Sequence, residues 1–151
     1  MEIEQFILQG FCLKCNLCCR FNQIDTIWTP KGIRPSPYKD YFICPHLNID
    51  TNRCRIYLSR SFDCKLYPFV LTRKNSKVFL GLDSRCPYTK DKLKADTLKE
   101  YVRYLVDLFS SEEFKGLLKK EPGLVANYDE DIAILKELPI SLSYKNETPS
   151  P

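Results

Sequence analysis

Residues 12–19 read CLKCNLCC, so four of the eight cysteines of the chain fall within one short stretch. The other four follow at Cys44, Cys54, Cys64 and Cys86, and none lies after that. A C-x2-C pair on a tight turn directs two sulfurs at one point, which is why this spacing recurs in zinc knuckles and in iron–sulfur loops. The crowding of thiols therefore indicates a metal site.

The full cysteine pattern is C-x2-C-x2-C-C, then 24 residues, C-x9-C-x9-C, then 21 residues and a last cysteine. Three thiolates on one loop suit three corners of a cuboidal cluster, whereas a zinc knuckle usually needs two. Adjacent residues rarely point the same way, so Cys18 and Cys19 are expected to face different metals or opposite sides of one polynuclear site. One partition, which the sequence alone does not establish, sets Cys12, Cys15, Cys18 and Cys86 against Cys19, Cys44, Cys54 and Cys64.

Buried small hydrophobes, disulfides and a redox-active C-x2-C pair are the alternatives to metal ligation. Thiol exchange needs two cysteines and not eight. The start of the chain has no basic region and no cleavage site of a signal peptide, and no run approaches the ~18 apolar residues of a membrane span. We therefore expect a cytoplasmic protein without membrane association, where thiols stay reduced and are free to bind metal.

The charge distribution agrees with a thiolate site. Residues 1–90 carry 14 Lys and Arg against 7 Asp and Glu, whereas residues 91–151 carry 9 against 12, for a net charge of +4. A four-thiolate site around Zn²⁺ or a [4Fe–4S]²⁺ cluster carries about −2, which nearby cations would balance. We attribute the excess of Lys and Arg in residues 1–90 to this charge balance rather than to nucleic-acid binding. Arg20 and Arg60 are the candidates for contacts just outside the ligands.

No catalytic arrangement of protein side chains emerges from the sequence. His46 is the only histidine, so every nucleophile–His–carboxylate arrangement would need it, and it is better explained as a loop residue near the site than as a ninth ligand. The five glycines form no phosphate-binding loop. Whether the protein is an enzyme stays open, because a bound metal could itself carry chemistry.

Regular elements are predicted on both sides of the last cysteine. Residues 67–82, YPFVLTRKNSKVFLGL, predict a β-hairpin, because two runs rich in β-branched and aromatic residues flank a turn. Apolar residues at helical spacing from Leu93 to Phe109 predict an amphipathic helix. A capping box of Ser110 and Glu113 predicts the start of a second helix, which ends near Lys120.

Other segments carry weaker patterns. A third helix is predicted over Asp129–Leu138, ended by Pro139. Residues 1–11 are expected to form a lead-in strand or turn that bends at Gly10. Residues 20–43 contain several helix and strand breakers and are expected to be irregular, apart from a short strand at Asp25–Trp28. One helical turn is expected at Arg55–Arg60.

These elements predict one α+β domain over residues 1–140. A chain of 151 residues can bury a core without the help of disulfides. An irregular, metal-stapled lobe with a short β-hairpin (residues 10–90) would pack against two or three C-terminal helices (residues 91–140), since neither part can bury its apolar face alone. Residues 141–151 are polar and proline-bearing, and a flexible tail is expected there.

Three segments resemble the CxxCxxCC, or YkgJ-type, cysteine-cluster family: GFCLKCNLCCR at 10–20, CPHLNIDTNRCRIYLSR at 44–60, and CKLYPF at 64–69. The chain departs from the pattern at Ser61, where the family tends to have proline, and at Lys65, where arginine is common. The resemblance covers roughly residues 10–90 and implies chelation of zinc or iron.

We therefore predict a metal-binding protein whose eight cysteines hold an iron–sulfur cluster, [4Fe–4S], or Zn²⁺, with an unidentified protein or redox partner. The alternative is a structural zinc module for protein or nucleic-acid interaction.

Overall fold

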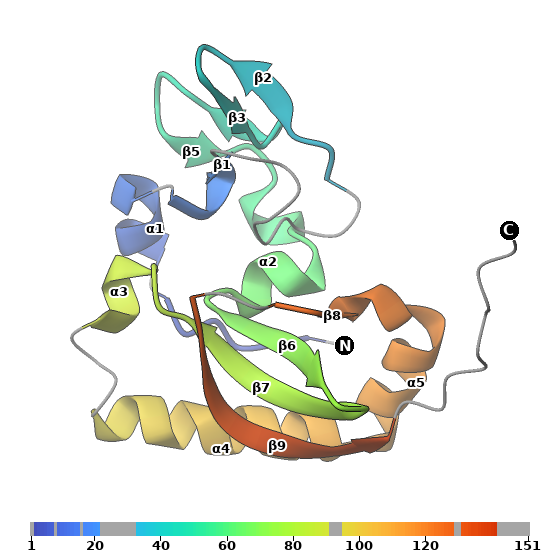
Figure 1. The fold of residues 1–151 in the computed structure, drawn as a ribbon. Coiled ribbons are helices and arrows are strands. Elements are labelled where there is room, and N and C mark those ends of the chain that lie inside the picture. The colour runs from blue at the N-terminus through green and yellow to red at the C-terminus, as the bar shows by residue number, and fades with distance from the viewer. Residues whose placement is uncertain are drawn as a thin grey trace, which may run out of the picture.

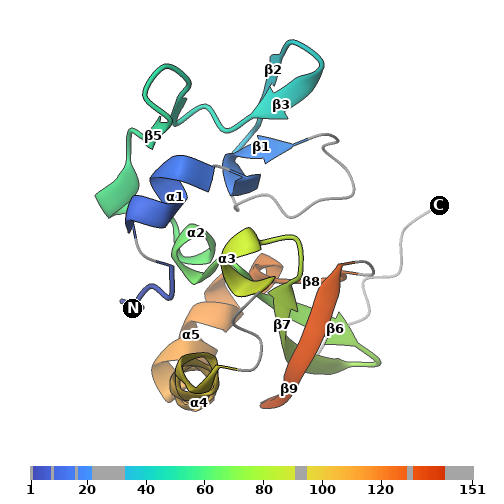
Figure 2. The ribbon, with the colours of Figure 1, turned by 90° about the vertical axis from the view of Figure 1, so that its left-hand side faces the viewer.

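The computed structural model describes residues 2–7, 9–15, 17–21, 33–90, 95–128 and 131–141. Short strands lie at one end of the molecule and a larger sheet with two helices at the other, with the three shortest α-helices between them (Figures 1 and 2). The α+β prediction is confirmed. None of the described helices is long and apolar enough to cross a membrane.

In chain order the elements are α1 (Gln9–Cys15), η1 (Leu17–Cys19), β1 (Arg20–Phe21), β2 (Ser36–Tyr38), β3 (Tyr41–Ile43), β4 (Leu47–Asn48), β5 (Arg53–Cys54), η2 (Tyr57–Ser59), α2 (Phe62–Leu66), β6 (Phe69–Lys74), β7 (Lys77–Asp83), α3 (Pro87–Lys90), α4 (Asp96–Ser110), α5 (Glu112–Lys120), η3 (Pro122–Leu124), β8 (Val125–Ala126) and β9 (Ile132–Ser141).

The predicted hairpin is confirmed as β6 and β7, which occupy the middle of a four-stranded sheet of order β8-β6-β7-β9. Its turn is Asn75-Ser76, and both residues have positive φ, as a two-residue turn between twisted strands requires. β8 runs parallel to β6, whereas β9 runs antiparallel to β7. The outer strands therefore come from the C-terminal part of the chain.

The third predicted helix is wrong, because from Ile132 on the chain forms β9. Leu138 and Ile140 are both buried and Pro139 between them is exposed, which is the two-residue alternation of a strand. Pairing with β7 supplies the backbone hydrogen bonds that a helix would have made internally. Pro139 is tolerated because β9 lies at an edge of the sheet, where part of the backbone needs no partner strand.

Two C-terminal helices are confirmed, with a correction to the cap between them. Ser111, and not Ser110, precedes α5, and its Oγ accepts a hydrogen bond from the backbone N–H of Phe114 at 3.2 Å. The same Oγ donates to the carbonyl of Leu108 at 2.6 Å. Ser111 therefore ends α4 and begins α5, whereas the Ser110 hydroxyl donates back to Val106 within α4.

The main core lies between the sheet and the two helices (Figure 1). α4 contributes Leu98, Leu105 and Phe109 from one face, at helical spacing. They meet the buried side chains of β6 and β7, and Phe114 of α5 packs on Phe109 at a ring-centroid distance of 4.5 Å. The apolar stripe of α4 thus covers the sheet.

A second, smaller core gathers around the short strands. Ile43, Cys44 and Leu47 are its buried members. β1, β3 and β2 form one small sheet and β4 and β5 another. The expected irregular structure of residues 20–43 is therefore wrong for the short strands it contains, because antiparallel pairing and this core order them.

Three further sequence predictions have different outcomes. The expected turn at Arg55–Arg60 is confirmed as η2. The lead-in strand or turn over residues 1–11 is wrong from Gln9 on, where α1 begins and Phe11 packs on Tyr88 at a ring-centroid distance of 4.8 Å. The strand predicted at Asp25–Trp28 lies outside the described residues, as does the tail beyond Ser141.

Candidate metal centre

The eight cysteines come from six elements or their junctions, and none is in a disulfide. Cys12 and Cys15 lie one turn apart in α1, and Cys18 and Cys19 lie in η1. The rest are distributed as follows: Cys44 after β3, Cys54 in β5, Cys64 in α2 and Cys86 between β7 and α3. In both views α1, α2 and α3 lie together between the short strands and the large sheet (Figures 1 and 2).

Cys12, Cys15 and Cys86 lie within electrostatic range of one another. Burial is the largest cause that raises the pKa of Cys12, and the charges of Cys86 and Cys15 raise it further, against the lowering effect of Arg60. Burial likewise raises the pKa of Cys86, and Cys15 adds to this. The first cysteine pair and the last cysteine of the chain are therefore neighbours.

Backbone pairing brings Cys19, Cys44 and Cys54 together. The N–H of Cys44 donates to the carbonyl of Cys19 at 2.9 Å, next to the pairing of β1 with β3. Leu47 pairs with Cys54 between β4 and β5. The pKa of Cys44 is raised mainly by burial and also by the charges of Cys19 and Cys54.

Cys18 and Cys19 are hydrogen-bonded to each other through their side chains, and this bond shifts the pKa values of the two thiols in opposite directions. It is the largest cause that raises the pKa of Cys18 and the largest that lowers the pKa of Cys19. Arg60 and Arg20 lower the pKa of Cys19 further. Cys19 is therefore stabilised as a thiolate, with Cys18 as its donor.

The two buried cysteines each begin a Cys-Pro turn. Cys44-Pro45 and Cys86-Pro87 both fix the backbone after the cysteine, and the next two N–H groups point back at its sulfur. These N–H groups belong to His46 and Leu47 in the first turn, and to Tyr88 and Thr89 in the second. Such hydrogen bonds favour the thiolate and tune the potential of a sulfur-bound metal.

Cys64 lies within electrostatic range of Cys18 and Cys19. Burial raises its pKa to about 12, and Cys19 adds to this effect. The buried hydroxyl of Ser61 is near enough to lower the pKa of the thiol, yet it makes no hydrogen bond of good geometry among the described residues. A charged sulfur at Cys64 would give that hydroxyl an acceptor.

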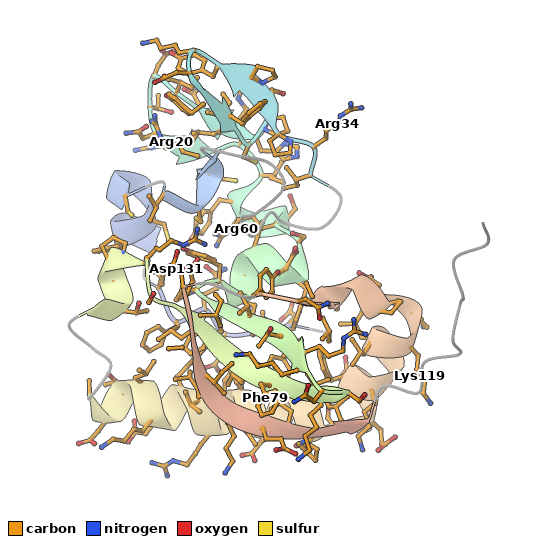
Figure 3. The ribbon with its side chains drawn as sticks, in the orientation of Figure 1. Arg20, Arg34, Arg60, Phe79, Lys119 and Asp131 are labelled. Atoms are coloured by element: carbon orange, nitrogen blue, oxygen red, sulfur yellow. The ribbon has the colours of Figure 1, made fainter. Side chains whose placement is uncertain are left out.

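Arg60 and Arg20 both lie against the cysteines. Figure 3 shows Arg20 beside the short strands and Arg60 nearer the middle of the molecule, between α1 and α2. Arg60 stacks on Tyr57 with its guanidinium carbon 3.8 Å from the ring centroid, and it lowers the pKa of Cys12, Cys19 and Cys64.

The Arg20 guanidinium donates to the hydroxyl of Tyr41 at 2.9 Å and to Asn52 Oδ1 at 3.0 Å. These contacts hold it in a fixed position near Cys19.

A carboxylate that the sequence analysis missed lies three residues before the last cysteine. Asp83 is 1% exposed and forms a two-pronged ion pair with Arg85, at 2.9 and 2.7 Å. The Tyr67 hydroxyl donates to the same carboxylate at 3.4 Å. The sequence does hold a signal for this ion pair: an acidic residue is followed two positions later by an arginine, and a Cys-Pro pair comes directly after.

The donor set fits zinc or iron by its chemistry, since both metals take thiolate ligands and all eight thiols are free of disulfides. Among the residues of known position, however, no three His, Cys, Asp or Glu side chains stand together closely enough to hold a metal ion as placed. The sulfurs are neighbours without converging on one point. His46 contributes a backbone N–H to Cys44.

Comparison with known families places the cysteine-rich part of the chain in context. The family model CxxCxxCC, described as "Putative zinc- or iron-chelating domain", matches residues 11–87, which is just over half of the chain. The matched range contains all eight cysteines, Arg20 and Arg60, and it ends directly after Cys86. No curated protein and no solved structure matches the chain.

Proposed function

Because the chain belongs to the CxxCxxCC family of zinc- or iron-chelating domains, we propose that its eight cysteines bind iron as an iron–sulfur centre. The observation that carries this proposal is the all-thiol donor set, in which sulfurs from five separate places in the chain influence one another's ionisation. A bound cluster would supply one-electron transfer.

The neighbour relations of the sulfurs support two groups of four. Cys12, Cys15 and Cys86 influence one another, and Cys18 is influenced by Cys12. This makes the first group. Cys19 influences Cys44 and Cys64, and Cys54 influences Cys44, which makes the second group.

The two groups adjoin each other, because Cys18 and Cys19 are hydrogen-bonded and the charges of Cys19 and Cys64 also act on Cys12 and Cys18, respectively. We propose that each group provides the ligands of one centre.

Burial of the thiols supports coupling between metal binding and folding. A buried thiol with a raised pKa keeps its proton at neutral pH, and a metal must displace that proton to bind. Loading would draw the sulfurs of each group closer and release protons. Arg60 and Arg20 would then face the negative charge of the loaded centre, and we propose that both stabilise it.

Zinc is the second candidate, for a structural module that binds protein or nucleic acid. It is favoured by the β4–β5 hairpin, where Cys44 and Cys54 stand near each other on a small core with the exposed Arg53 and Arg55 beside them. Free thiols in either case persist best in a reducing compartment, and we infer a cytoplasmic location.

The test is metal and sulfide analysis of protein purified without oxygen. An iron–sulfur centre predicts iron with acid-labile sulfide and a broad absorption near ~400 nm that bleaches with dithionite. Colourless protein with stoichiometric zinc would favour the zinc module, and protein without either metal would refute metal binding.

Two cysteine variants, Cys86→Ser and Cys44→Ser, test the grouping. Each should remove the metal of one group and leave that of the other, whereas loss of all metal from both variants would indicate a single polynuclear centre.

A further inference from the structure

We propose that Asp83 is a positioning residue for the metal centre, and that it holds the Cys86 turn against α2 through Arg85 and Tyr67. This inference rests on the proposed function, since it concerns how the ligand Cys86 is held. It assigns a role to a carboxylate that is itself no member of the cysteine pattern.

The carboxylate of Asp83 has an unusually full set of partners for a buried acid. One oxygen accepts from the backbone N–H and from Nε of Arg85, at 3.0 and 2.9 Å. The other accepts from the second guanidinium nitrogen at 2.7 Å and from the Tyr67 hydroxyl at 3.4 Å. A buried charge with such partners is geometrically fixed, because each lost partner would leave part of the charge unsatisfied.

These partners join two cysteine-bearing segments. Tyr67 directly follows α2, which carries Cys64, and the N–H of Asp83 donates to the carbonyl of Pro68 at 2.9 Å. On the other side, the N–H of Cys86 donates to the carbonyl of Asp83 at 3.2 Å. Asp83 is thus bonded through its backbone and its side chain to both segments.

A third contact comes from outside the range that matches the family. The carbonyl of Asp131 accepts from the N–H and the hydroxyl of Ser84, at 2.8 and 2.9 Å. Its carboxylate lies 3.8 Å from Nε of Arg85. Figure 3 shows Asp131 at the end of β9 that lies nearest α3. The residue that precedes the C-terminal strand therefore also holds the segment before Cys86 in place.

Tyr67 connects this network to the sulfurs. Its ring lies close enough to Cys18 and Cys86 for their charges to act on its hydroxyl, which also bonds Asp83. Removal of this single hydroxyl would loosen the link and leave the packing of the ring intact. A positioning role and a general role in folding can thus be separated.

The experiment uses Co²⁺ as the probe, added without oxygen to the reduced, metal-free full-length chain. The thiolate–cobalt absorption bands report the ligand geometry, and competition with a coloured chelator gives the affinity. The variants are Asp83→Asn, Tyr67→Phe and Arg85→Lys. The matched control is Glu137→Gln, which removes an exposed carboxylate paired with Lys77 on the same sheet, at 2.9 Å.

We expect Asp83→Asn and Tyr67→Phe to weaken Co²⁺ binding by ~10-fold and to shift the bands, as loss of groups that orient ligands does elsewhere. Arg85→Lys keeps the positive charge but not the two-pronged contact with Asp83, so its Co²⁺ affinity should lie between that of these variants and that of the unaltered chain. The Co²⁺ affinity and bands of Glu137→Gln should match those of the unaltered chain.

Equal affinity and identical bands in folded Asp83→Asn and Tyr67→Phe would overturn the inference. If Asp83→Asn does not fold, the result for Tyr67→Phe decides. Failure of the unaltered chain to bind Co²⁺ would instead argue against metal binding by the cysteines, which is the proposed function itself.

Discussion

Replacement of Gly81 by alanine should destabilise the protein, because β7 and β9 approach too closely there for a side chain. A Cβ at this position would lie 2.4 Å from Cγ2 of Ile132 and 3.2 Å from Cγ2 of Val70. Both neighbours are β-branched and stiff, so Ile132 cannot swing its methyl group away and the strand must shift. Overpacking of this kind costs about 1–3 kcal/mol. For a chain of this length each kcal/mol lowers Tm by ~2–4 °C.

Gly116 provides a control of opposite sign for the same chemical change. It lies within α5, and a Cβ added there would meet nothing within 4 Å. Gly116→Ala should therefore stabilise the chain by about 0.5–1 kcal/mol, since alanine loses less entropy in a helix.

Urea unfolding followed by circular dichroism, with all samples equally metal-loaded and reduced, measures both variants. In the double variant, Ile132→Ala should reduce the loss of stability caused by Gly81→Ala, because it removes the methyl group that the new Cβ would meet. Equal stability of Gly81→Ala and the original chain would refute the close approach of the two strands.

Three further predictions concern the site and its surroundings. Arg60→Gln should slow alkylation of Cys19 in the metal-free protein at neutral pH, because the guanidinium lowers the pKa of that thiol; an unchanged rate would contradict this. Ser111→Ala should cost about 1 kcal/mol in urea unfolding through loss of a helix cap, and more than Ser110→Ala does. Metal-free protein should lose stability as the pH rises above 9.0, because the Cys64 thiol ionises at about 12 when folded and earlier when unfolded. Unfolding at about pH 8 and about pH 10 checks this, and Cys64→Ser should lose less stability over that interval.

The elements with strong local signals could be predicted from the sequence. The hairpin followed from two β-rich runs and a short turn, and α4 from a long apolar stripe that needs only one partner surface. The segment around Ile134 and Leu138 was different, since a short apolar run fits both a helix and a strand. Pairing with β7 makes this segment a strand, and the sequence around Ile134 and Leu138 does not reveal that β7 lies beside it.

The candidate site divides in the same way. The cysteines could be proposed as ligands because thiols at such spacing have few other uses, and Arg20 and Arg60 could be proposed from their proximity to cysteines and from the family resemblance. Asp83 was not identified, because an acid between strand and turn looks like an ordinary surface residue until its burial is known. Pairings between distant sulfurs, such as Cys12 with Cys86, depend on the packing of α1 beside α3.

The arrangement of the large sheet limits how the chain can be shortened. A fragment trimmed to residues 11–87 would keep β6 and β7 and lose both strands that flank them, together with the helices that cover Leu71 and Leu80. Its hairpin would then have two unpaired strand edges and an exposed apolar face. Such edges are templates for β-pairing between molecules. Such a fragment should precipitate even though it carries every cysteine.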